Sequence, residues 1–205
     1  MPGAWFYNLI YRFGAPWEGG PRPELVELVN SGVLAPATLP PGRAVDLGCG
    51  SGANAVFLAE HGFTATGIDF SPVALRKATR LAATRGVAER THWVHGDLTA
   101  PSVPGAEGPF DLLVDYGTLD DLGADGRRAM AELATRLARP GAKFLLWCFY
   151  AAPEELPRIS FSGPSRLSPA IAPGEETALF GDAFEIERLP EPSRGPYACF
   201  LMTRR

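Results

Sequence analysis

Short apolar runs alternate along most of the chain with longer segments in which apolar residues recur at helical spacing. The runs have the length and composition of buried strands, and the segments between them have the length of ordinary helices. This alternation predicts a parallel sheet wound on both sides by helices. Strands are expected at 44–47, 91–95, 110–115 and 143–150, with another ending at Gly67-Ile68-Asp69, and helices over 53–61, 71–86 and 125–139.

The boundaries of these segments carry recognisable signals. Ser71 is expected as an N-cap with Pro72 at the first helical position, and Gly62 and Gly86 as the C-caps of the first two helices. The pair Pro140-Gly141 is expected to turn the chain from the third helix into the strand at 143–150.

The last part of the chain departs from the alternation. Residues 183–189 and 197–203 read as two strands joined by a turn rich in proline and glycine, with no helix between them, so they are expected to pair antiparallel. The predicted fold is therefore α/β, a doubly wound, Rossmann-like, seven-stranded sheet that is mostly parallel with an antiparallel C-terminal strand.

A glycine-rich turn follows the first of these strands. Gly48, Gly50 and Gly52 separate the strand from the helix at 53–61, so a ligand can approach bare backbone near the positive end of a helix. The spacing Gly48-x-Gly50-x-x-Ala53 also satisfies the fingerprint of dinucleotide folds, with Asp69 near the position of a ribose-binding acid. This motif alone is therefore also consistent with a nicotinamide-dependent oxidoreductase.

Further residues distinguish the two interpretations. Asp46 lies two positions before the first glycine, and the turn His95-Gly96-Asp97-Leu98 follows the third strand. With the glycine set and the expected closing hairpin, these features resemble class I S-adenosylmethionine-dependent methyltransferases over nearly the whole chain. The hairpin is not expected of an ordinary dinucleotide fold.

The resemblance implies S-adenosylmethionine as cofactor and a role for each matching position. In that family the glycine turn holds the methionine part, the acid after strand two binds the ribose, and the turn after strand three contacts adenine. The implied contacts are Asp46, Gly48, Cys49 and Gly50 on the methionine side, Asp69 on the ribose, Phe70 on an adenine face, Gly96, Asp97 and Leu98 at the adenine edge, and Asp115 and Tyr116 beside the methyl group.

The loop after the fourth strand departs from the family pattern. Many relatives place one or two histidines at the positions of Asp120 and Asp121. Two adjacent carboxylates can accept a proton or bind an amine, but they are also ordinary as solvated or capping acids. No catalytic residue is assigned; the candidates are Tyr11, Asp120 and Asp121. Because of this departure, the sequence is also consistent with a non-catalytic module that binds S-adenosylmethionine without transferring its methyl group.

Two segments outside the predicted sheet are expected to cover a substrate. The first, residues 1–22, is rich in aromatic side chains and reads as a lid that excludes water and attracts a sulfonium cation. One helical stripe is expected to dock on the sheet, formed by Phe6, Leu9, Ile10 and Phe13. Other faces carry Trp5, Tyr7, Tyr11 and Trp17.

The pair Pro16-Trp17 resembles an element of small-molecule methyltransferases of the thiopurine and tellurite-resistance group, so Trp17 is expected to contact the cofactor. The second segment, 151–174, follows the last parallel strand at the ligand-binding edge of the sheet and is expected to be a substrate lid or a mobile surface loop.

Composition and charge limit the number of domains and the kinds of partner that are expected. The 205 residues, 46% of them hydrophobic, are expected to form one domain over 1–205. A net charge of −4 without a basic run argues against a nucleic-acid partner, and no apolar run is long enough to span a membrane. Cys49, Cys148 and Cys199 lack metal or disulfide spacing, which fits a reducing cytoplasm and predicts no metal.

The sequence therefore predicts transfer of a methyl group from S-adenosylmethionine to O, N or S of a small, hydrophobic acceptor, by an in-line displacement that depends mainly on alignment.

Overall fold

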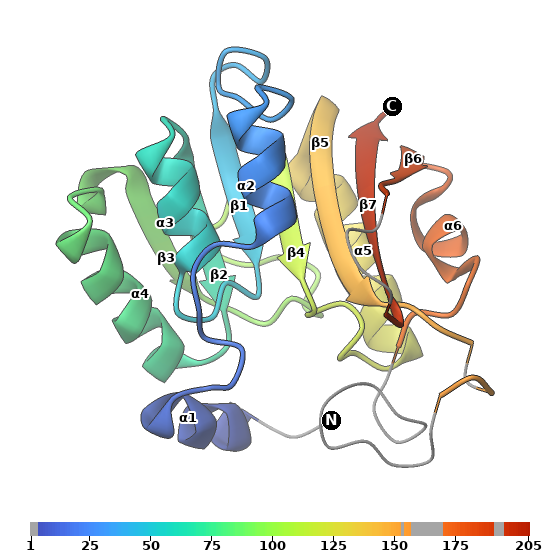
Figure 1. Ribbon diagram of the computed structural model, residues 1–205, viewed down its shortest axis with the longest axis horizontal. Helices are drawn as coiled ribbons and strands as arrows, with labels where there is room; N and C mark the ends of the chain where they lie inside the picture. The colour runs from blue at the N-terminus through green and yellow to red at the C-terminus, as the bar shows by residue number, and fades with distance from the viewer. Residues whose placement is uncertain (1–3, 153, 157–169, 191–194) are drawn as a thin grey trace.

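The computed structural model describes residues 4–152, 154–156, 170–190 and 195–205 and contains a seven-stranded sheet of order β3-β2-β1-β4-β5-β7-β6 (Figure 1). The first five strands of this order, β3-β2-β1-β4-β5, pair in parallel. Strand β7 runs antiparallel to both of its neighbours, β5 and β6. The predicted fold class is confirmed. The strands are β1 (Arg43–Leu47), β2 (Thr64–Asp69), β3 (Thr91–His95), β4 (Phe110–Tyr116), β5 (Ala138–Phe149), β6 (Phe184–Arg188) and β7 (Tyr197–Arg204).

Helices cover both faces of the sheet (Figure 1). Neighbouring residues of β1 point to opposite faces, so Ala44 packs in the apolar cluster under α2 and α3, and Val45 packs in the cluster under α5 and α6. Within the described residues, no helix has both the length and the apolar character needed to cross a membrane. The helices are α1 (Ala4–Phe13), α2 (Pro23–Asn30), α3 (Ala53–Glu60), α4 (Pro72–Thr84), α5 (Ala124–Leu137) and α6 (Glu175–Phe180), with a 3-10 turn at Ala88–Arg90.

Helix α1 lies across the carboxyl ends of the strands, beside α4 (Figure 1). The predicted docking of one apolar stripe on the sheet is wrong for two of its members, because Leu9 is 45% exposed and Phe13 is 84% exposed. The inward face carries Tyr7 and Tyr11 instead, and their hydroxyl groups have polar partners inside. Apolar periodicity could not reveal this orientation, since it scores a tyrosine ring below a phenylalanine ring.

Strand β5 begins earlier than expected. Ala138 pairs with Phe110, and the ladder resumes at Lys143 with Leu112 after an irregularity. The pair Pro140-Gly141 thus lies within the strand, where Gly141 has φ +77°. The predicted turn is a local interruption of the strand, and α5 ends at Leu137.

The predicted substrate lid at 151–174 lies partly outside the described residues, which leave out 153 and 157–169. Its two ends meet beside β5: the Ala151 amide donates to the Ile171 carbonyl at 3.1 Å, and the Ile171 amide donates to the Phe149 carbonyl at 2.8 Å. Ile171 is fully buried. The segment therefore leaves the sheet and returns to it at the same place.

Candidate functional site

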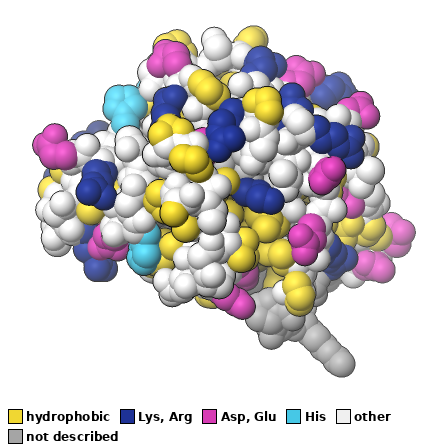
Figure 2. Space-filling model, turned by 90° about the horizontal axis from the view of Figure 1, so that it is seen from above, with side chains coloured by type: hydrophobic (Ala, Val, Ile, Leu, Met, Phe, Trp, Pro, Cys, Tyr) yellow, Lys and Arg dark blue, Asp and Glu magenta, His cyan; other side chains and the backbone are white. Residues whose placement is uncertain are grey.

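A cavity of about 1180 Å³ opens at the carboxyl ends of β1, β2, β3 and β4 and is roofed by α1. Its walls combine glycine backbone, acidic side chains and aromatic rings. At the opposite end of the parallel strands, acidic and basic side chains are interspersed over the surface (Figure 2). The carboxyl ends of the strands are where open α/β sheets bind ligands, so this cavity is the candidate site.

The glycine turn after β1 forms one wall. The amides of Gly48 and Cys49 both donate to the Ile68 carbonyl at 2.9 Å, which fixes the turn against the end of β2. A Cβ atom at Gly50 would lie 2.5 Å from the Tyr11 hydroxyl oxygen, so the roof closes directly on bare backbone. The α3 helix begins at once after Gly52, without a side-chain cap, and its first amides can serve an anionic group of a ligand.

Asp69, at the end of β2, connects two turns of the cavity wall. Its Oδ2 accepts from the Gly50 amide at 2.8 Å and its Oδ1 accepts from the Ser71 amide at 2.7 Å. The residue is 4% exposed, and burial raises the pKa of its carboxyl group despite these bonds. Each carboxylate oxygen has a second lone pair, so Asp69 can still accept bonds from ligand hydroxyl groups.

Asp46 and Asp115 lie behind the cavity wall. Asp46 is 2% exposed, and its Oδ2 has no hydrogen-bond partner among the described residues. Burial, followed by the charge of Asp69, raises the pKa of Asp46 to about 7. The two oxygens of Asp115 accept from the amides of Thr118 at 2.9 Å and Leu119 at 3.0 Å, and burial raises the pKa of Asp115 to about 7. Asp115 therefore shapes the loop after β4.

The adjacent acids of that loop differ from each other. Asp121 accepts a hydrogen bond from the Tyr7 hydroxyl of α1 at 2.9 Å. Asp120 is 1% exposed, and its Oδ1 has no partner in the described part of the chain. Burial raises the pKa of Asp120 to about 8, with smaller contributions from Asp115 and Asp121. Asp121 thus holds the roof through Tyr7, whereas Asp120 is a buried carboxyl group with one oxygen that accepts no hydrogen bond.

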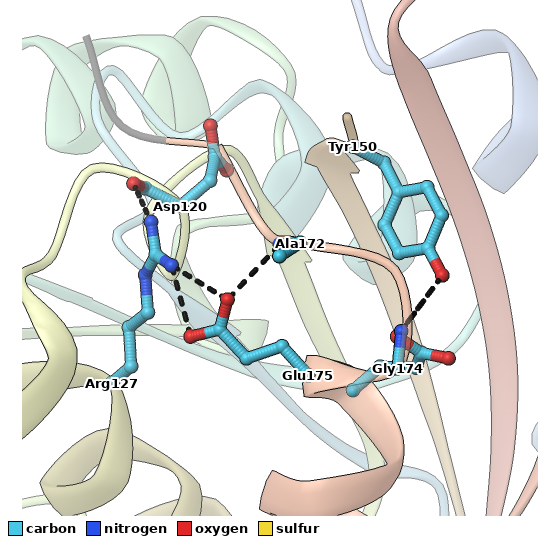
Figure 3. A network of polar contacts seen from close by, with 7 residues as sticks. Asp120, Arg127, Tyr150, Ala172, Gly174 and Glu175 are labelled. Carbon is cyan, nitrogen blue, oxygen red and sulfur yellow. Dashed lines mark hydrogen bonds and ion pairs between the residues drawn. The ribbon is translucent and has the colours of Figure 1, made fainter. Parts of the chain in front are cut away.

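The main chain of Asp120 is held from behind by Arg127 of α5 (Figure 3). The Arg127 guanidinium is bonded to both oxygens of Glu175 at 2.9 Å and donates to the Asp120 carbonyl at 2.9 Å. Glu175 in turn accepts from the Ala172 amide at 3.0 Å. This partly buried network joins the loop after β4 to the start of α6. No sequence pattern indicated it, because Arg127 and Glu175 look like ordinary surface charges of two helices.

Several polar contacts anchor the roof on α4. Ser71 donates to the Asn8 side chain at 2.6 Å, and Lys77 pairs with Glu18 at 2.8 Å. Trp17 donates to the Tyr11 hydroxyl oxygen at 3.0 Å. With the Tyr7 contact to Asp121, these bonds hold the N-terminal segment on two sides of the cavity.

The remaining wall is aromatic. Tyr116 stacks on Trp147 at a centroid distance of 6.1 Å, and the Arg22 guanidinium lies 5.8 Å from the Tyr116 ring centroid. Asn54 accepts from the Arg22 amide at 3.1 Å. Of these cavity residues the sequence reasoning named only Tyr116. Arg22, Asn54 and Trp147 gave no motif, because they come from separate segments that meet only in the fold.

Comparisons with known proteins agree on one family. Residues 44–141 match the family model described as "Methyltransferase domain". The chain is 33% identical over 135 residues to 2-heptyl-1-hydroxyquinolin-4(1H)-one methyltransferase of Mycobacteroides abscessus, covering 65% of this chain and 56% of that protein. It is 27% identical, with a TM-score of 0.75, to a structure described under "Conversion of a Disulfide Bond into a Thioacetal Group during Echinomycin Biosynthesis", covering 99% of this chain and 93% of that one.

The chain is similar to S-adenosylmethionine-dependent methyltransferases and has the Rossmann-like fold of their class I members. A TehB-like S-adenosylmethionine-dependent methyltransferase from Corynebacterium glutamicum shares this fold with a TM-score of 0.62 at 19% identity, over 98% of this chain and 96% of that one. The chain spans about half the length of the curated relatives it matches. The cofactor implied by the family is S-adenosylmethionine.

Most positions assigned to the cofactor of this methyltransferase family line the cavity. Asp46 and Asp115 do not line it, whereas the three catalytic candidates do. Their individual roles stay predictions. Among the described residues, no group of three or more His, Cys, Asp or Glu side chains is placed to hold a metal ion. The predicted positions in the lining are Tyr11, Trp17, Gly48, Cys49, Gly50, Asp69, Phe70, Gly96, Asp97, Leu98, Tyr116, Asp120 and Asp121.

The buried acid Asp120 predicts a pH-dependent stability. Because the pKa of Asp120 is raised to about 8, folding stabilises its protonated form, and this stability is lost as pH rises from about 4 through about 8. The variant Asp120→Asn stays neutral, so we expect its melting temperature to exceed that of the wild type by about 5 °C at pH 8.5, corresponding to about 2 kcal/mol. At pH 4.5 the difference should nearly vanish, which thermal melts without ligand will test; equal differences at both pH values would contradict the assignment.

The contact between Tyr7 and Asp121 predicts a second measurable effect. Tyr7→Phe removes the hydrogen bond that holds α1 on the loop after β4, so we expect S-adenosylhomocysteine to bind about tenfold more weakly. Calorimetric titration measures this change. Phe13→Ser is the matched control, since Phe13 is on the outer face of the same helix and is 84% exposed. Similar affinities for Tyr7→Phe and the wild type would mean that this contact does not hold the roof over the ligand.

Proposed function

We propose that the protein transfers the methyl group of S-adenosylmethionine to O, N or S of a small, hydrophobic acceptor. The observation that carries this proposal is the cavity itself, in which the glycine turn, Asp69 and the Gly96-Asp97 turn meet an aromatic wall under a closed roof. The similarity to methyltransferases supports the cofactor, and the aromatic wall supports the preference for a hydrophobic acceptor.

The residues present suit an adenosyl cofactor. The glycine turn lines the cavity with Gly48 and Gly50, and the methionine part would lie beside it at the first turn of α3, where the amides suit a carboxylate group. Asp69 would accept from ribose hydroxyl groups, and Phe70 offers an apolar ring next to it on the cavity wall. Trp17 would contact the cofactor from the roof, as in the thiopurine and tellurite-resistance group.

The protein contributes alignment and exclusion of water. When bound, the cofactor would supply a methyl group on a sulfonium, whose sulfur leaves readily as a neutral thioether, so the barrier would depend chiefly on positioning. Tyr7, Tyr11 and Trp17 close the cavity above the ligand. A cavity covered by aromatic side chains limits competing attack by water.

The acceptors in the printed names of relatives support a broad assignment. One relative is described as acting on 2-heptyl-1-hydroxyquinolin-4(1H)-one, two as tocopherol O-methyltransferases and another as a probable thiol methyltransferase. These acceptors differ in the methylated atom, while most have an apolar body. The proposal therefore keeps O, N and S open and commits to a small apolar acceptor.

The test is methyl transfer to a panel of acceptors. The protein is incubated with S-adenosylmethionine and, separately, a 2-alkyl-1-hydroxyquinolin-4-one, a phenol, an aromatic thiol and an aromatic amine, and both S-adenosylhomocysteine and the methylated product are measured by mass spectrometry. We expect product with at least one member and none with the Asp69→Ala variant.

Tight binding of S-adenosylhomocysteine without product from any acceptor would contradict this proposal. It would favour the non-catalytic module, which is consistent with Asp120 and Asp121 standing where many relatives have histidines.

A further inference from the structure

We propose that Asp46 and Asp120 make the cavity select a cationic adenosyl ligand over a neutral one, so that S-adenosylmethionine is retained and S-adenosylhomocysteine is released. The inference rests on the proposed function and goes beyond it, because it assigns two residues to the discrimination between substrate and product cofactor. The two ligands differ by one methyl group and by the positive charge of the sulfonium.

The two carboxyl groups stand at neighbouring strand ends. Asp46 is in β1, two positions before Gly48 of the glycine turn, and Asp120 is in the loop that follows β4. β1 and β4 are adjacent in the sheet, with Leu47 in register with Asp115. Asp120 lines the cavity, whereas Asp46 lies behind its wall next to the glycine turn, where the methionine part of the cofactor is proposed to lie.

Each of the two side chains has one carboxylate oxygen without a partner. Asp46 Oδ2 and Asp120 Oδ1 are buried and form no hydrogen bond in the described part of the chain. By contrast, Asp69 and Asp115 have both oxygens bonded to backbone amides, and Asp121 is bonded to Tyr7. A buried polar atom without a partner is costly. A ligand cation would relieve that cost by direct contact at Asp120 and by its charge, across the wall, at Asp46.

No side-chain cation of the described residues forms an ion pair with Asp46 or Asp120. Arg127 is the basic residue behind Asp120, but its guanidinium is bonded to Glu175 and to the Asp120 main chain. Figure 3 shows the Asp120 carboxyl group directed away from that guanidinium. Arg22 acts on Asp46 only at a distance, as the smallest influence on its pKa.

The other titratable groups near the two acids are acidic or neutral. Asp46 is influenced by Asp69 of β2 and in turn acts on Asp115 of β4 and on the Cys49 thiol. Asp120 is influenced by Asp115 and Asp121, and it acts on Tyr7 of α1 and on Cys148 of β5. The acids at this end of the cavity outnumber the cations that act on them, Arg22 on Asp46 and Arg127 on Asp121, so their ionisation concentrates negative charge there.

Because of this arrangement, the affinity for a charged cofactor should depend on pH through the ionisation of the two acids. In the ligand-free protein the pKa of Asp46 is about 7 and that of Asp120 is about 8, so both are largely protonated at pH 6 and largely ionised at pH 8.5. A bound sulfonium favours the ionised carboxylates, lowers their pKa values and releases protons. A neutral thioether has none of these effects. The affinity for the cation should therefore rise with pH relative to the affinity for the neutral ligand.

The experiment is calorimetric titration of the full chain with S-adenosylmethionine, S-adenosylhomocysteine and sinefungin, a stable adenosyl analogue with an amine in place of the sulfonium. Titrations are run between pH 6 and pH 8.5 in buffers of different ionisation enthalpy, which report proton release. We expect the affinity ratio of either cation to S-adenosylhomocysteine to rise about tenfold, equivalent to one unit of pKa, and protons to be released only with the cations.

The variants Asp46→Asn and Asp120→Asn should each remove a large part of the pH dependence while still binding S-adenosylhomocysteine. If one of them fails to fold, the other still tests the proposal. Asp125→Asn is the matched control, because the Asp125 side chain is 98% exposed, and it should keep the wild-type ratio at every pH.

An affinity ratio that stays constant within twofold across this pH range, with S-adenosylhomocysteine bound, would overturn this inference alone. A full pH effect in both asparagine variants would also overturn it. Absence of binding of all three ligands would instead overturn the proposed function from which the inference starts.

Discussion

Replacing Asp69 by asparagine is expected to weaken binding of S-adenosylmethionine and S-adenosylhomocysteine by about 100-fold, or about 3 kcal/mol. Asp69 accepts from the amides of Gly50 and Ser71 with different oxygens. An asparagine side chain has only one acceptor oxygen, so its NH2 group would face one of these amides. Two turns of the cavity wall would lose their common anchor, together with the acceptor proposed for the ribose.

Calorimetric titration with S-adenosylhomocysteine measures this loss, and thermal melts show whether the variant is folded. Asp125→Asn makes the same chemical change at a side chain that is 98% exposed, and it should bind as the wild type does. A folded Asp69→Asn variant with affinity within threefold of the wild type would remove Asp69 from the cofactor site.

The second large effect is expected from Gly48→Ala. Gly48 has φ +78°, and a Cβ atom there would lie 1.9 Å from Thr118 Oγ1. Thr118 cannot move away freely, because its hydroxyl group donates to the Leu47 carbonyl at 3.1 Å. The left-handed backbone and the collision together should destabilise the protein by about 3 kcal/mol or more, lowering the melting temperature by about 6–12 °C.

Gly86→Ala separates the two causes. Gly86 has φ +72°, but a Cβ atom there would meet nothing within 4 Å. This control should therefore lose only the backbone part, about 1–2 kcal/mol, and should keep its affinity for the cofactor. Thermal melts of both variants make the comparison. Equal destabilisation would mean that the contact between the glycine turn and the loop after β4 does not constrain Gly48.

The strand ends and the glycine turn could be predicted from the sequence because local signals specify them. A buried strand followed by Gly48, Gly50 and Gly52 leaves few alternatives for the backbone, and Ser71-Pro72 marks a helix start that the structure contains, with Ser71 accepting from the Ala74 amide. The two last strands were recognisable because no helix separates them. Their order in the sheet, with β7 between β5 and β6, came only from the structure.

The roof and the polar interior were less accessible to prediction. The orientation of α1 depends on partners distant in sequence, such as Asp121 for Tyr7, and no periodicity contains that information. The partly buried ion pair of Arg127 and Glu175 likewise joins two helices that are separated in the chain by β5. Sequence reasoning placed acids at the strand ends but could not show which of them would be left with an unbonded oxygen, as Asp120 is.

The most direct test of the central claim is which cofactor enters the cavity. Calorimetric titration of the purified protein with S-adenosylmethionine, S-adenosylhomocysteine and NADH, run in parallel, decides between the two nucleotide-binding interpretations of the glycine turn. We predict binding of both adenosyl ligands with one site per chain and no heat from NADH. Binding of NADH without either adenosyl ligand would contradict the account and favour an oxidoreductase.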